Sequence, residues 1–307
     1  MAWRKLGLVY APEGDAPWAR SHALAPTPVL RDDGRLRIYL SSCDAQMVGS
    51  VGYVELDPAS PTRVLKVAHR PVLGPGAPGC FDDNGVNVTA MLRVGDEWWM
   101  YYFGYQLCQR VRYVLFAGLA ISRDDGETFQ RVSQVPILDR SDGERYVRSA
   151  PFVLRQGDGF RMWYVSGDEF IDVGGKQVPR YGLRYLESDN GLDWAKSGLP
   201  IVSPQGVDEY GFGRPFVLAT PSGYRMWYSH RTRSQWYRIG YAESQDGVRW
   251  TRRDGDAGIS TSETGFDSDI VCYASVIDTS AGRLMFYNGN DYGRTGFGVA
   301  IEQAGQR

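Results

Sequence analysis

The sequence predicts an all-β fold, a five-bladed β-propeller in which each blade contains four antiparallel strands. The first observation behind this prediction is a triplet of apolar and aromatic residues that recurs about every 60 residues, as one repeated structural unit does. The five triplets are Ile38-Tyr39-Leu40, Met100-Tyr101-Tyr102, Met162-Trp163-Tyr164, Met226-Trp227-Tyr228 and Met285-Phe286-Tyr287. The second observation is that no stretch of helical length shows a sustained 3.6-residue period, which argues against helices.

Each repeat carries three strand signals in the same order. An apolar run comes first and predicts the inner strand, at residues 28–30, 89–92, 151–154, 215–218 and 274–277. The triplet predicts the second strand, and an alternating run predicts the third, at residues 51–56, 118–122, 182–187, 239–243 and 296–301. In the three middle repeats a polar turn such as Ser244-Gln245-Asp246-Gly247 follows, and Asp-Gly and Asn-Gly turns are typical of antiparallel strand connections.

A fourth strand follows in most repeats, and we expect it at residues 70–73, 135–138 and 198–202. The last repeat has no such segment, but residues 3–12 resemble residues 194–204. The amino-terminal strand is therefore expected to complete the last blade and to close residues 1–307 into a single propeller domain. A linear β-solenoid is the competing architecture, although its repeats are usually shorter and its ends need caps.

Composition limits the classes of function. The net charge of −2 gives no general attraction to nucleic acid or membrane, and no run approaches the roughly 20 apolar residues of a membrane span. The four cysteines are scattered and the amino terminus has no apolar signal stretch, so we expect reduced thiols and a cytoplasmic protein. The three histidines show no metal-ligand spacing, so neither a metal nor another cofactor is expected. The oligomeric state stays open.

The residues that precede the inner strands are the candidate site, because these strand ends meet around the channel of a propeller. One tier of aligned positions differs in every repeat and contains His22, Asp83, Arg145, Glu209 and Ser268. The tier before it is acidic in four repeats and contains Ser21, Asp82, Glu144, Asp208 and Asp267. Asp and Asn before a strand are ordinary turn formers, so the acidic tier has a structural interpretation beside the functional one. Different residues at equivalent positions indicate function on a symmetric scaffold.

Arginines and aromatic residues form two further sets. Arg148 and Arg214 stand at the channel ends of the third and fourth repeats, and His230 and Arg231 follow the fourth triplet. Such arginines either neutralise nearby carboxylates or form a fork for a carboxylate or phosphate. The aromatic triplets are expected in the core, whereas the loop residues Trp18, Tyr105, Phe170 and Trp236 are candidate stacking surfaces.

The repeat of a polar entrance, a Pro-Phe-Val-Leu strand, a Met-Trp-Tyr strand and a Ser-x-Asp-Gly-x-x-Trp turn resembles the five-bladed propellers of glycoside hydrolase families 43, 32 and 130. The resemblance covers nearly the whole chain. It implies a carboxylate pair in the channel, with Asp83 as base, Glu209 as general acid and Asp269 as helper. It departs from family 43 at His22, where an aspartate is expected, and it lacks the Asn-Asp-Pro-Asn-Gly signature of family 32.

We therefore expect an enzyme that hydrolyses a glycosidic bond of a small carbohydrate, and the basic residues at the channel mouth favour an anionic sugar. The residues expected to bind the substrate are His22, Asp82, Arg145, Arg148, Arg214, His230, Arg231 and Asp267. One alternative is a phosphorylase that uses phosphate as the nucleophile. The other is a non-catalytic sugar-binding propeller or a biosynthetic enzyme on the same scaffold.

Overall fold

The computed structural model describes residues 2–303 and consists almost entirely of β-strands, which confirms the all-β prediction. The strands pair into successive antiparallel groups of four. The only helical segments of the described residues are one short 3-10 turn, η1 (Asp254–Asp256), and one short helix, α1 (Asn290–Gly293). None of the helical segments in residues 2–303 has the length and apolar character needed to cross a membrane.

The groups follow one another along the chain. The first contains β2 (Ser21–Leu30), β3 (Leu36–Cys43), β4 (Gly49–Asp57) and β5 (Ser60–Val67). The second contains β6 (Val86–Val94), β7 (Glu97–Leu107), β8 (Tyr113–Ser122) and β9 (Gln130–Arg131). The third contains β10 (Val147–Gln156), β11 (Gly159–Val173), β12 (Lys176–Ser188) and β13 (Leu199–Val202). The fourth contains β14 (Glu209–Thr220), β15 (Gly223–Thr232), β16 (Arg238–Ser244) and β17 (Thr251–Arg252). The fifth contains β18 (Cys272–Thr279), β19 (Gly282–Asn288), β20 (Phe297–Glu302) and β1 (Trp3–Tyr10).

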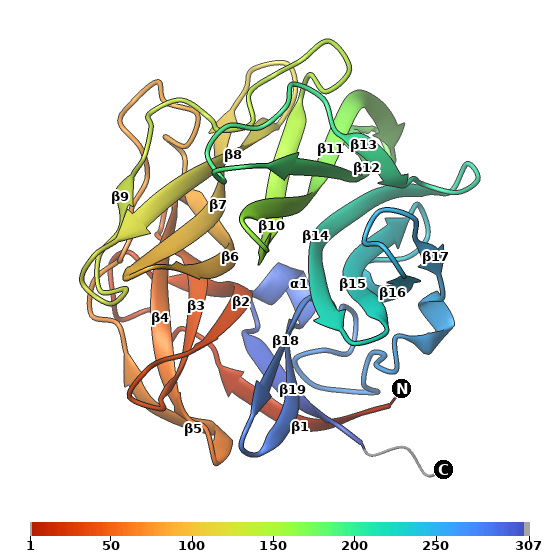
Figure 1. The fold of residues 1–307 in the computed structure, drawn as a ribbon. Coiled ribbons are helices and arrows are strands. Elements are labelled where there is room, and N and C mark those ends of the chain that lie inside the picture. The colour runs from red at the N-terminus through yellow and green to blue at the C-terminus, as the bar shows by residue number, and fades with distance from the viewer. Residues whose placement is uncertain (1, 304–307) are drawn as a thin grey trace.

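The groups are arranged around a common centre, with the first strand of each group nearest to it and α1 close to the axis (Figure 1). Strand β1 pairs antiparallel with β20, from Trp3 opposite Glu302 to Tyr10 opposite Phe297. The two ends of the chain therefore contribute to the same sheet. Short parallel contacts join neighbouring groups, at Val147 opposite Leu115 and at Tyr181 opposite Gly211.

Two of the expected fourth strands lie elsewhere. The outer strand of the first group is β5, and residues 70–73 contribute only an isolated bridge between Val51 and Leu73. In the second group β9 forms the outer strand, and residues 135–138 contribute a bridge between Ala117 and Leu138. The third prediction is confirmed, since β13 covers most of residues 198–202. Outer strands are short and half exposed, so their apolar pattern is weak and their position is the hardest to predict.

A repeated hydrogen bond joins each of the first three blades to the next. Tyr39 Oη donates to the carbonyl of Gly126, Tyr101 Oη to that of Gly191, and Trp163 Nε1 to that of Gly247. Each acceptor is the turn glycine of the following blade, and each has a positive φ. A Cβ at Gly126 would lie 2.0 Å from Tyr39 Oη, so the turn needs glycine both for its backbone and for this close approach.

Between the fourth and fifth blades, aromatic packing takes the place of this hydrogen bond. The indole nitrogen of Trp227 has no hydrogen-bond partner among the described residues. Its ring instead meets that of Trp3 edge to face, with the centroids 6.1 Å apart. Strand β1 thus supplies an aromatic contact where no Ser-x-Asp-Gly turn follows.

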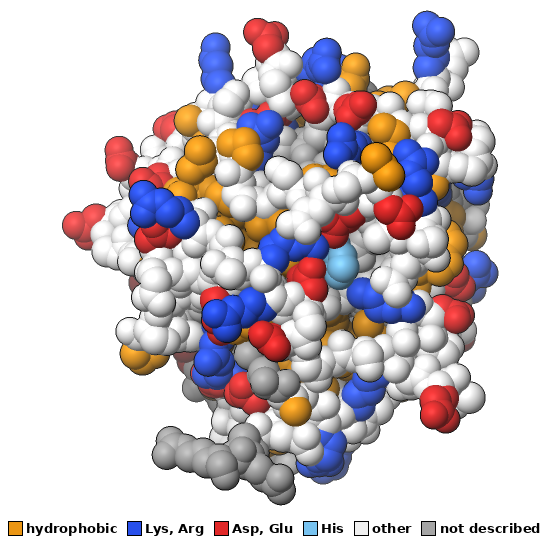
Figure 2. Space-filling view, turned by 90° about the vertical axis from the view of Figure 1, so that its right-hand side faces the viewer, with side chains coloured by type: hydrophobic (Ala, Val, Ile, Leu, Met, Phe, Trp, Pro, Cys, Tyr) orange, Lys and Arg blue, Asp and Glu red, His pale blue; other side chains and the backbone are white. Residues whose placement is uncertain are grey.

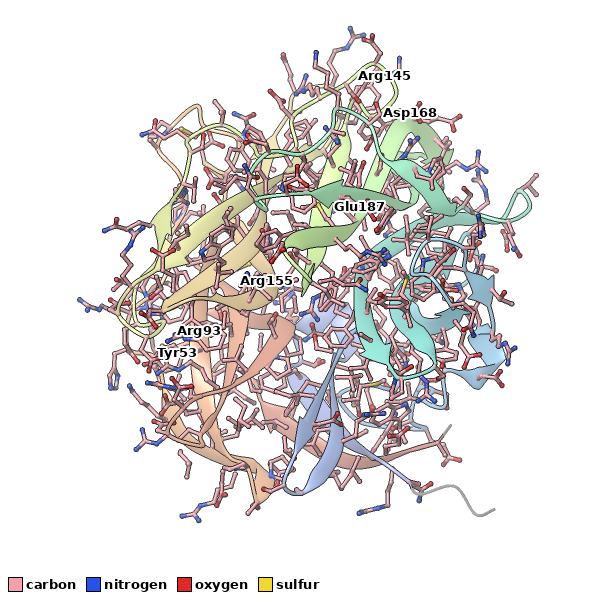
Figure 3. All side chains as sticks on the ribbon, in the orientation of Figure 1. Tyr53, Arg93, Arg145, Arg155, Asp168 and Glu187 are labelled. Atoms are coloured by element: carbon pink, nitrogen blue, oxygen red, sulfur yellow. The ribbon has the colours of Figure 1, made fainter. Side chains whose placement is uncertain are left out.

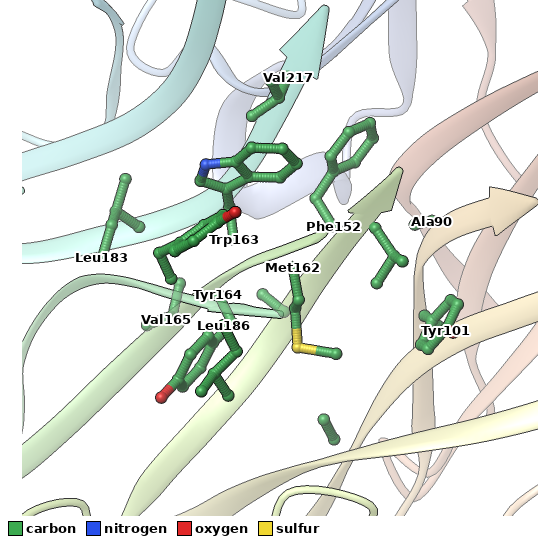
Figure 4. Packing of buried hydrophobic residues seen from close by; sticks show 14 of the residues in the cluster. Ala90, Tyr101, Phe152, Met162, Trp163, Tyr164, Val165, Leu183, Leu186 and Val217 are labelled. Carbon is green, nitrogen blue, oxygen red and sulfur yellow. The ribbon is translucent and has the colours of Figure 1, made fainter. Parts of the chain in front are cut away.

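The triplet residues are core residues, as the sequence indicated. Met162, Trp163 and Tyr164 are fully buried, and Figure 4 shows them packed with Phe152 and Val217 between two blades. The surface has a different character, because cationic and anionic side chains are interspersed over the face in Figure 2. This mixture agrees with the small net charge.

Candidate functional site

A buried carboxylate at the entrance end of the blades, where the inner strands begin, binds both a tyrosine of the second strand and a cation. We call this arrangement a brace. Asp82 accepts hydrogen bonds from Tyr102 Oη (3.1 Å) and from Arg131 Nε (2.7 Å) on β9. Asp267 accepts from Tyr287 Oη (2.9 Å) and from Lys5 Nζ (2.6 Å) on β1. Both carboxylates are almost completely buried, so the structural interpretation of the acidic tier holds for them.

The third blade has the same brace with a longer acid. Glu144 is completely buried and accepts hydrogen bonds from Tyr164 Oη (2.6 Å), Arg148 Nε (3.2 Å) and the backbone nitrogen of Gly198 (2.9 Å). Arg148 also donates to the carbonyls of Asp139 and Ala195. Each nitrogen of its guanidinium therefore has an acceptor inside the blade, in agreement with the structural alternative considered for this arginine.

The fourth brace differs from the others, because its buried carboxylate, Glu209, contacts the cation Arg252 but not the tyrosine, and Tyr228 Oη donates to Asp254 instead. Arg252 on β17 makes two hydrogen bonds to Glu209, each of 2.9 Å, and also donates to Tyr228 Oη (3.1 Å). His230 Nδ1 lies 3.0 Å from the same carboxylate. The expected tier residue, Asp208, is exposed. Glu209 thus shares with Asp82 a buried carboxylate bound by an arginine of the outer strand.

The surroundings of Glu209 favour its ionised form, which bears on the role of general acid expected for it. Burial alone would raise the pKa of Glu209, but hydrogen bonds from His230, Arg252 and the backbone of Gln205 lower it to about 2. A general acid must carry a proton near neutral pH. Glu209 is ionised there, and its charge is compensated within the blade.

The central cavity is mainly apolar. Its lining includes Leu24, Phe103, Leu115, Val165, Tyr181, Phe212 and Arg214, and its empty volume is about 480 Å³. Four of the lining residues have a positive φ. Each of them lies where the pairing register of an inner strand shifts: Ala25, Ala150, Arg214 and Tyr273. Such bulges bend a strand and change the direction of its side chains. No carboxylate of residues 2–303 lines this cavity.

Arg214 connects three inner strands at the cavity. It donates to the carbonyls of Tyr273 (2.7 Å) and Pro26 (3.1 Å) and to Thr27 Oγ1 (2.7 Å). Complete burial lowers the pKa of Arg214 to about 9, so it remains charged at neutral pH. Its donors point at backbone and hydroxyl oxygens, which indicates a role in holding the ring together.

A larger pocket lies between two hairpins at the entrance end, and we call it the mouth pocket. Its walls are the β7–β8 connection and the end of the β11–β12 hairpin, with Arg231 of β15 as a further lining residue. Its empty volume is about 970 Å³, part of which is open solvent. The lining residues are Cys108, Gln109, Arg110, Val111, Arg112, Tyr113, Phe170, Lys176, Gln177, Val178, Pro179 and Arg231. They include four cations and, in the described part of the chain, no carboxylate.

Arg231 is surrounded by tyrosines. Its side chain donates from Nη2 to Tyr181 Oη (2.7 Å), and its guanidinium carbon lies 4.7 Å from the ring centre of Tyr210 and 4.9 Å from that of Tyr237. Arg231 is 9% exposed and makes no ion pair with a carboxylate of residues 2–303. Tyr181 and Tyr237 also line the central cavity, so Arg231 lies between this cavity and the mouth pocket.

The segment α1 lies close to the centre of the molecule (Figure 1). Asp291 and Tyr292 have φ values of 52° and 58°, a left-handed conformation that is costly for residues other than glycine. The Tyr292 ring lies 5.8 Å from that of Tyr237. His22 is close enough to respond to the charges of this segment: burial lowers its pKa, Arg294 lowers it further, and Asp291 opposes the change.

The remaining expected site residues are not gathered in one place. Asp83 Oδ2 accepts a hydrogen bond from the backbone of Gly79 (2.9 Å), as a turn former does. Asp269 is exposed, and Asn290 Oδ1 binds its backbone nitrogen beside α1 (2.7 Å). Arg145 is exposed and bonds the carbonyl of Asp168 (2.9 Å), and Figure 3 shows this pair near the upper edge of the ring.

Of the eight residues expected to bind substrate, only Arg231 lines the mouth pocket, and Arg214 lines the central cavity. Asp82, Arg148, Asp267 and His230 belong to braces. Within residues 2–303 no three His, Cys, Asp or Glu side chains are grouped so as to hold a metal ion.

Sequence reasoning missed Tyr181 and Tyr237, and it indicated Tyr292 only as part of the polar, glycine-rich segment 287–293, a structural loop or one wall of the pocket. Each was hidden among nineteen tyrosines, most of which have a plain strand role. The sequence signal that could have found Asp291 and Tyr292 is the polar segment between the last triplet and the last strand, which is longer than a hairpin requires.

The fold occurs in solved glycoside hydrolases. One solved glycoside hydrolase is 19% identical, with a TM-score of 0.73 over 99% of this chain and 93% of that one. A thermostable family-43 glycoside hydrolase is 16% identical, with a TM-score of 0.66 over 93% of this chain and 90% of that one. A member of the family 130 mannoside phosphorylases and hydrolases, which target β-1,2-mannosidic linkages in Candida mannan, is 15% identical. It has a TM-score of 0.69 over 98% of this chain and 94% of that one.

These comparisons define the class of protein: the chain has the fold of the propeller glycoside hydrolases, as the sequence resemblance predicted. No family model matches the chain. Uncharacterized protein Rv1502 of Mycobacterium tuberculosis is 38% identical over 301 residues, which cover 98% of this chain and 99% of that protein. The chain therefore belongs to the same protein family as Rv1502.

Proposed function

We propose that the protein is a glycosidase-like enzyme that acts on a small anionic carbohydrate bound in the mouth pocket. The observation that carries this proposal is the charge of that pocket, where Arg110, Arg112, Lys176 and Arg231 occur without a carboxylate of the described residues. A pocket with uncompensated cations attracts anions and raises their local concentration. The fold supports the carbohydrate part of the proposal, because solved proteins with this fold include glycoside hydrolases.

The proposal includes the architecture that creates the pocket. Residues 1–307 form one five-bladed propeller, closed by pairing of β1 with β20. The five groups of four strands and the twelve-stranded sheet that connects three of them support it.

For hydrolysis, one carboxyl group must protonate the leaving oxygen and a second must activate water or attack the anomeric carbon. We propose Asp269 and Asp291 for these roles in place of Asp83 and Glu209. Asp291 precedes Tyr292, which packs on Tyr237 next to Arg231. Asp269 precedes Ile270, which packs in the same cluster of Tyr237, Tyr273 and Tyr292. His22 is a candidate ligand, because its pKa responds to Asp291.

The cationic pocket also suits a second function, phosphorolysis. There phosphate is the nucleophile, the cations hold it, and one carboxylic acid is sufficient. The absence of a carboxylate from the cavity lining among residues 2–303 favours this alternative over a hydrolase with two channel carboxylates. It equally favours a sugar-binding propeller without catalysis.

A turnover screen separates the three functions. Purified protein is incubated with aryl glycosides of glucuronic and galacturonic acid, with neutral glycosides and with sugar phosphates, each with and without inorganic phosphate. Release of the aglycone without phosphate supports hydrolysis, and phosphate-dependent release supports phosphorolysis. Binding without release supports the non-catalytic function. Turnover of neutral glycosides alone would contradict the anionic substrate.

Location in the cytoplasm remains part of this proposal. Cys43, Cys80, Cys108 and Cys272 are free thiols in the structure. Free cysteines are usual in reducing compartments. Recovery of the natural protein from the culture medium or an extracellular fraction would contradict it.

A further inference from the structure

We infer that the mouth pocket recognises a phosphoryl group, so that the carbohydrate is a phosphate-bearing sugar anchored by Arg231. This inference rests on the function proposed above and names its substrate class. The surroundings of Arg231, the charges at the rim of the pocket and the exposed face of Trp236 support it.

Arg231 is the only nine-tenths-buried cation among the lining residues of the mouth pocket. By contrast, the buried Arg148 has a carboxylate as a partner, and the buried Arg214 has several carbonyl oxygens. Arg231 has a phenol, Tyr181 Oη, and its Nε makes no hydrogen bond within the described part of the chain. Burying a guanidinium without a counter-charge is costly, and an anion bound in the adjacent pocket reduces this cost.

The alternation of strand β15 directs Arg231 toward the pocket. His230 and Arg231 are consecutive, so their side chains leave opposite faces of the strand. His230 joins the Glu209 brace, whereas Arg231 lies against Tyr210 and Tyr237. The two basic residues that are adjacent in sequence thus have separate surroundings.

The rim of the pocket adds three cations. Arg110 and Arg112 come from the β7–β8 connection and Lys176 from the start of β12. Arg110 and Arg112 are exposed, as is Lys176, and none of the three forms an ion pair with a carboxylate of residues 2–303. A uronate carries one charge on two oxygens, whereas a phosphate monoester carries close to two charges on three oxygens at neutral pH. Four uncompensated cations therefore fit the phosphoryl group better than a carboxylate.

Trp236 supplies a surface for the sugar ring. It is 59% exposed, and its ring stands edge-on to Tyr292 with the centroids 6.4 Å apart. Tyr292 contacts Tyr237, which contacts Arg231. An exposed indole offers apolar surface with a polar edge. A sugar ring on Trp236 can therefore place its phosphoryl group toward Arg231.

The test measures binding by calorimetry and by tryptophan fluorescence. The probes are inorganic phosphate, pyrophosphate, glucose 1-phosphate, glucuronate and glucose, each against the full-length protein. Arg231→Lys keeps the charge but loses the fork, and the double change Arg110→Ser with Arg112→Ser alters only exposed side chains. Arg249→Ala is the matched control, because Arg249 is on the same blade, is 92% exposed and lies outside the mouth pocket.

We expect glucose 1-phosphate to bind at least about 10-fold more tightly than glucuronate, and glucose to bind more weakly than both. Arg231→Lys should weaken glucose 1-phosphate binding about 10- to 100-fold, and the rim double variant about 3- to 10-fold with a reduced salt dependence. Arg249→Ala should leave binding unchanged. Glucose 1-phosphate should change the fluorescence of the protein, and Trp236→Ala should abolish most of this change.

The outcomes separate this inference from the proposed function. If glucuronate binds as tightly as glucose 1-phosphate, the phosphoryl inference fails while the anionic-carbohydrate function stands. If phosphate and pyrophosphate bind through Arg231 but no sugar improves their binding, the phosphoryl site stands and the carbohydrate function fails. If the rim double variant, which should fold normally, binds every phosphate probe like the parent protein, the inference is wrong.

Discussion

The braces and the mouth pocket lie at the same end of the blades but have opposite charge arrangements. In each brace a buried carboxylate meets a cation, and in three of the four it also meets a tyrosine, as Asp267 meets Tyr287 and Lys5. In the mouth pocket Arg231 is buried among tyrosines without a carboxylate, although Glu209 starts the strand that pairs with β15. The first arrangement contains its own counter-charge. The mouth pocket gains a counter-charge only when an anion binds. This difference in charge compensation separates a ligand site from a structural ion pair.

The largest effect is expected when one brace is removed with its strand. Deletion of residues 1–12 removes Lys5 from Asp267, the β1–β20 ladder and the contact of Trp3 with Trp227. Since these include several backbone hydrogen bonds and a buried indole, the free energy of unfolding should fall by at least about 4 kcal/mol. The exposed edge of β20 should also promote aggregation.

Chemical denaturation and light scattering measure this effect. Lys5→Met is the matched variant, since it removes the cation and leaves the strand. If the deletion protein unfolds at the same denaturant concentration as the parent, β1 does not support the last blade.

The next effect is the loss of the brace carboxylate of the fourth blade. Glu209→Ala leaves Arg252 and His230 without their common partner, and breaking a buried pair in this way should cost about 3 kcal/mol. Asp208→Ala is the control, because Asp208 is adjacent and exposed. Thermal unfolding compares the two variants. Equal destabilisation by both would mean that Glu209 is not a brace residue.

The contrast between Glu209 and Asp208 shows what the sequence could predict. The all-β fold, the buried triplets and the position of the inner strands follow from periodicity, because each strand repeats its apolar pattern at a fixed spacing. The site does not follow in the same way. A shift of one residue between neighbouring tiers decides whether a carboxylate is buried in a brace or exposed at the entrance. The sequence pattern does not specify which residues a loop carboxylate contacts.

The same limit explains Arg148, Arg214 and Arg231, which looked alike in the sequence. Their difference lies in partners that are distant along the chain: Ala195 for Arg148, and Pro26 for Arg214. For Arg231 the partners are tyrosines of two blades. Tertiary contacts decided that Arg214 is bonded by carbonyl oxygens and Arg231 by a phenol.

A pH titration of stability gives a smaller effect of the same brace. The pKa of Glu209 is about 2 in the folded protein and 4.5 in its ordinary state. Because the folded value is the lower one, the stabilisation is complete above pH 4.5 and disappears as the pH falls through 2. By pH 3 about 2 kcal/mol of this contribution should be lost.

The measurement is the difference in unfolding free energy between the parent and Glu209→Gln, followed by urea denaturation from pH 7 to pH 3. The difference should shrink toward low pH, because glutamine cannot titrate. A difference that stays constant over this range would show that Glu209 is not ionised in a brace.

The smallest effect is expected for Asp83→Asn. This variant tests whether Asp83, which lies outside the mouth pocket, takes part in binding or turnover. Asp83 is partly exposed, and its carboxylate accepts one hydrogen bond from the backbone of Gly79, which an asparagine oxygen can also accept. The change in unfolding free energy should therefore stay below about 0.5 kcal/mol. Binding of an anionic sugar should also be unchanged, since Asp83 does not line the mouth pocket.

Asp291→Asn, next to Tyr292, provides the comparison and should reduce turnover of the substrate that the screen identifies. If Asp83→Asn abolishes turnover while Asp291→Asn retains it, the reaction takes place at the start of β6 and Asp83 regains the role of base.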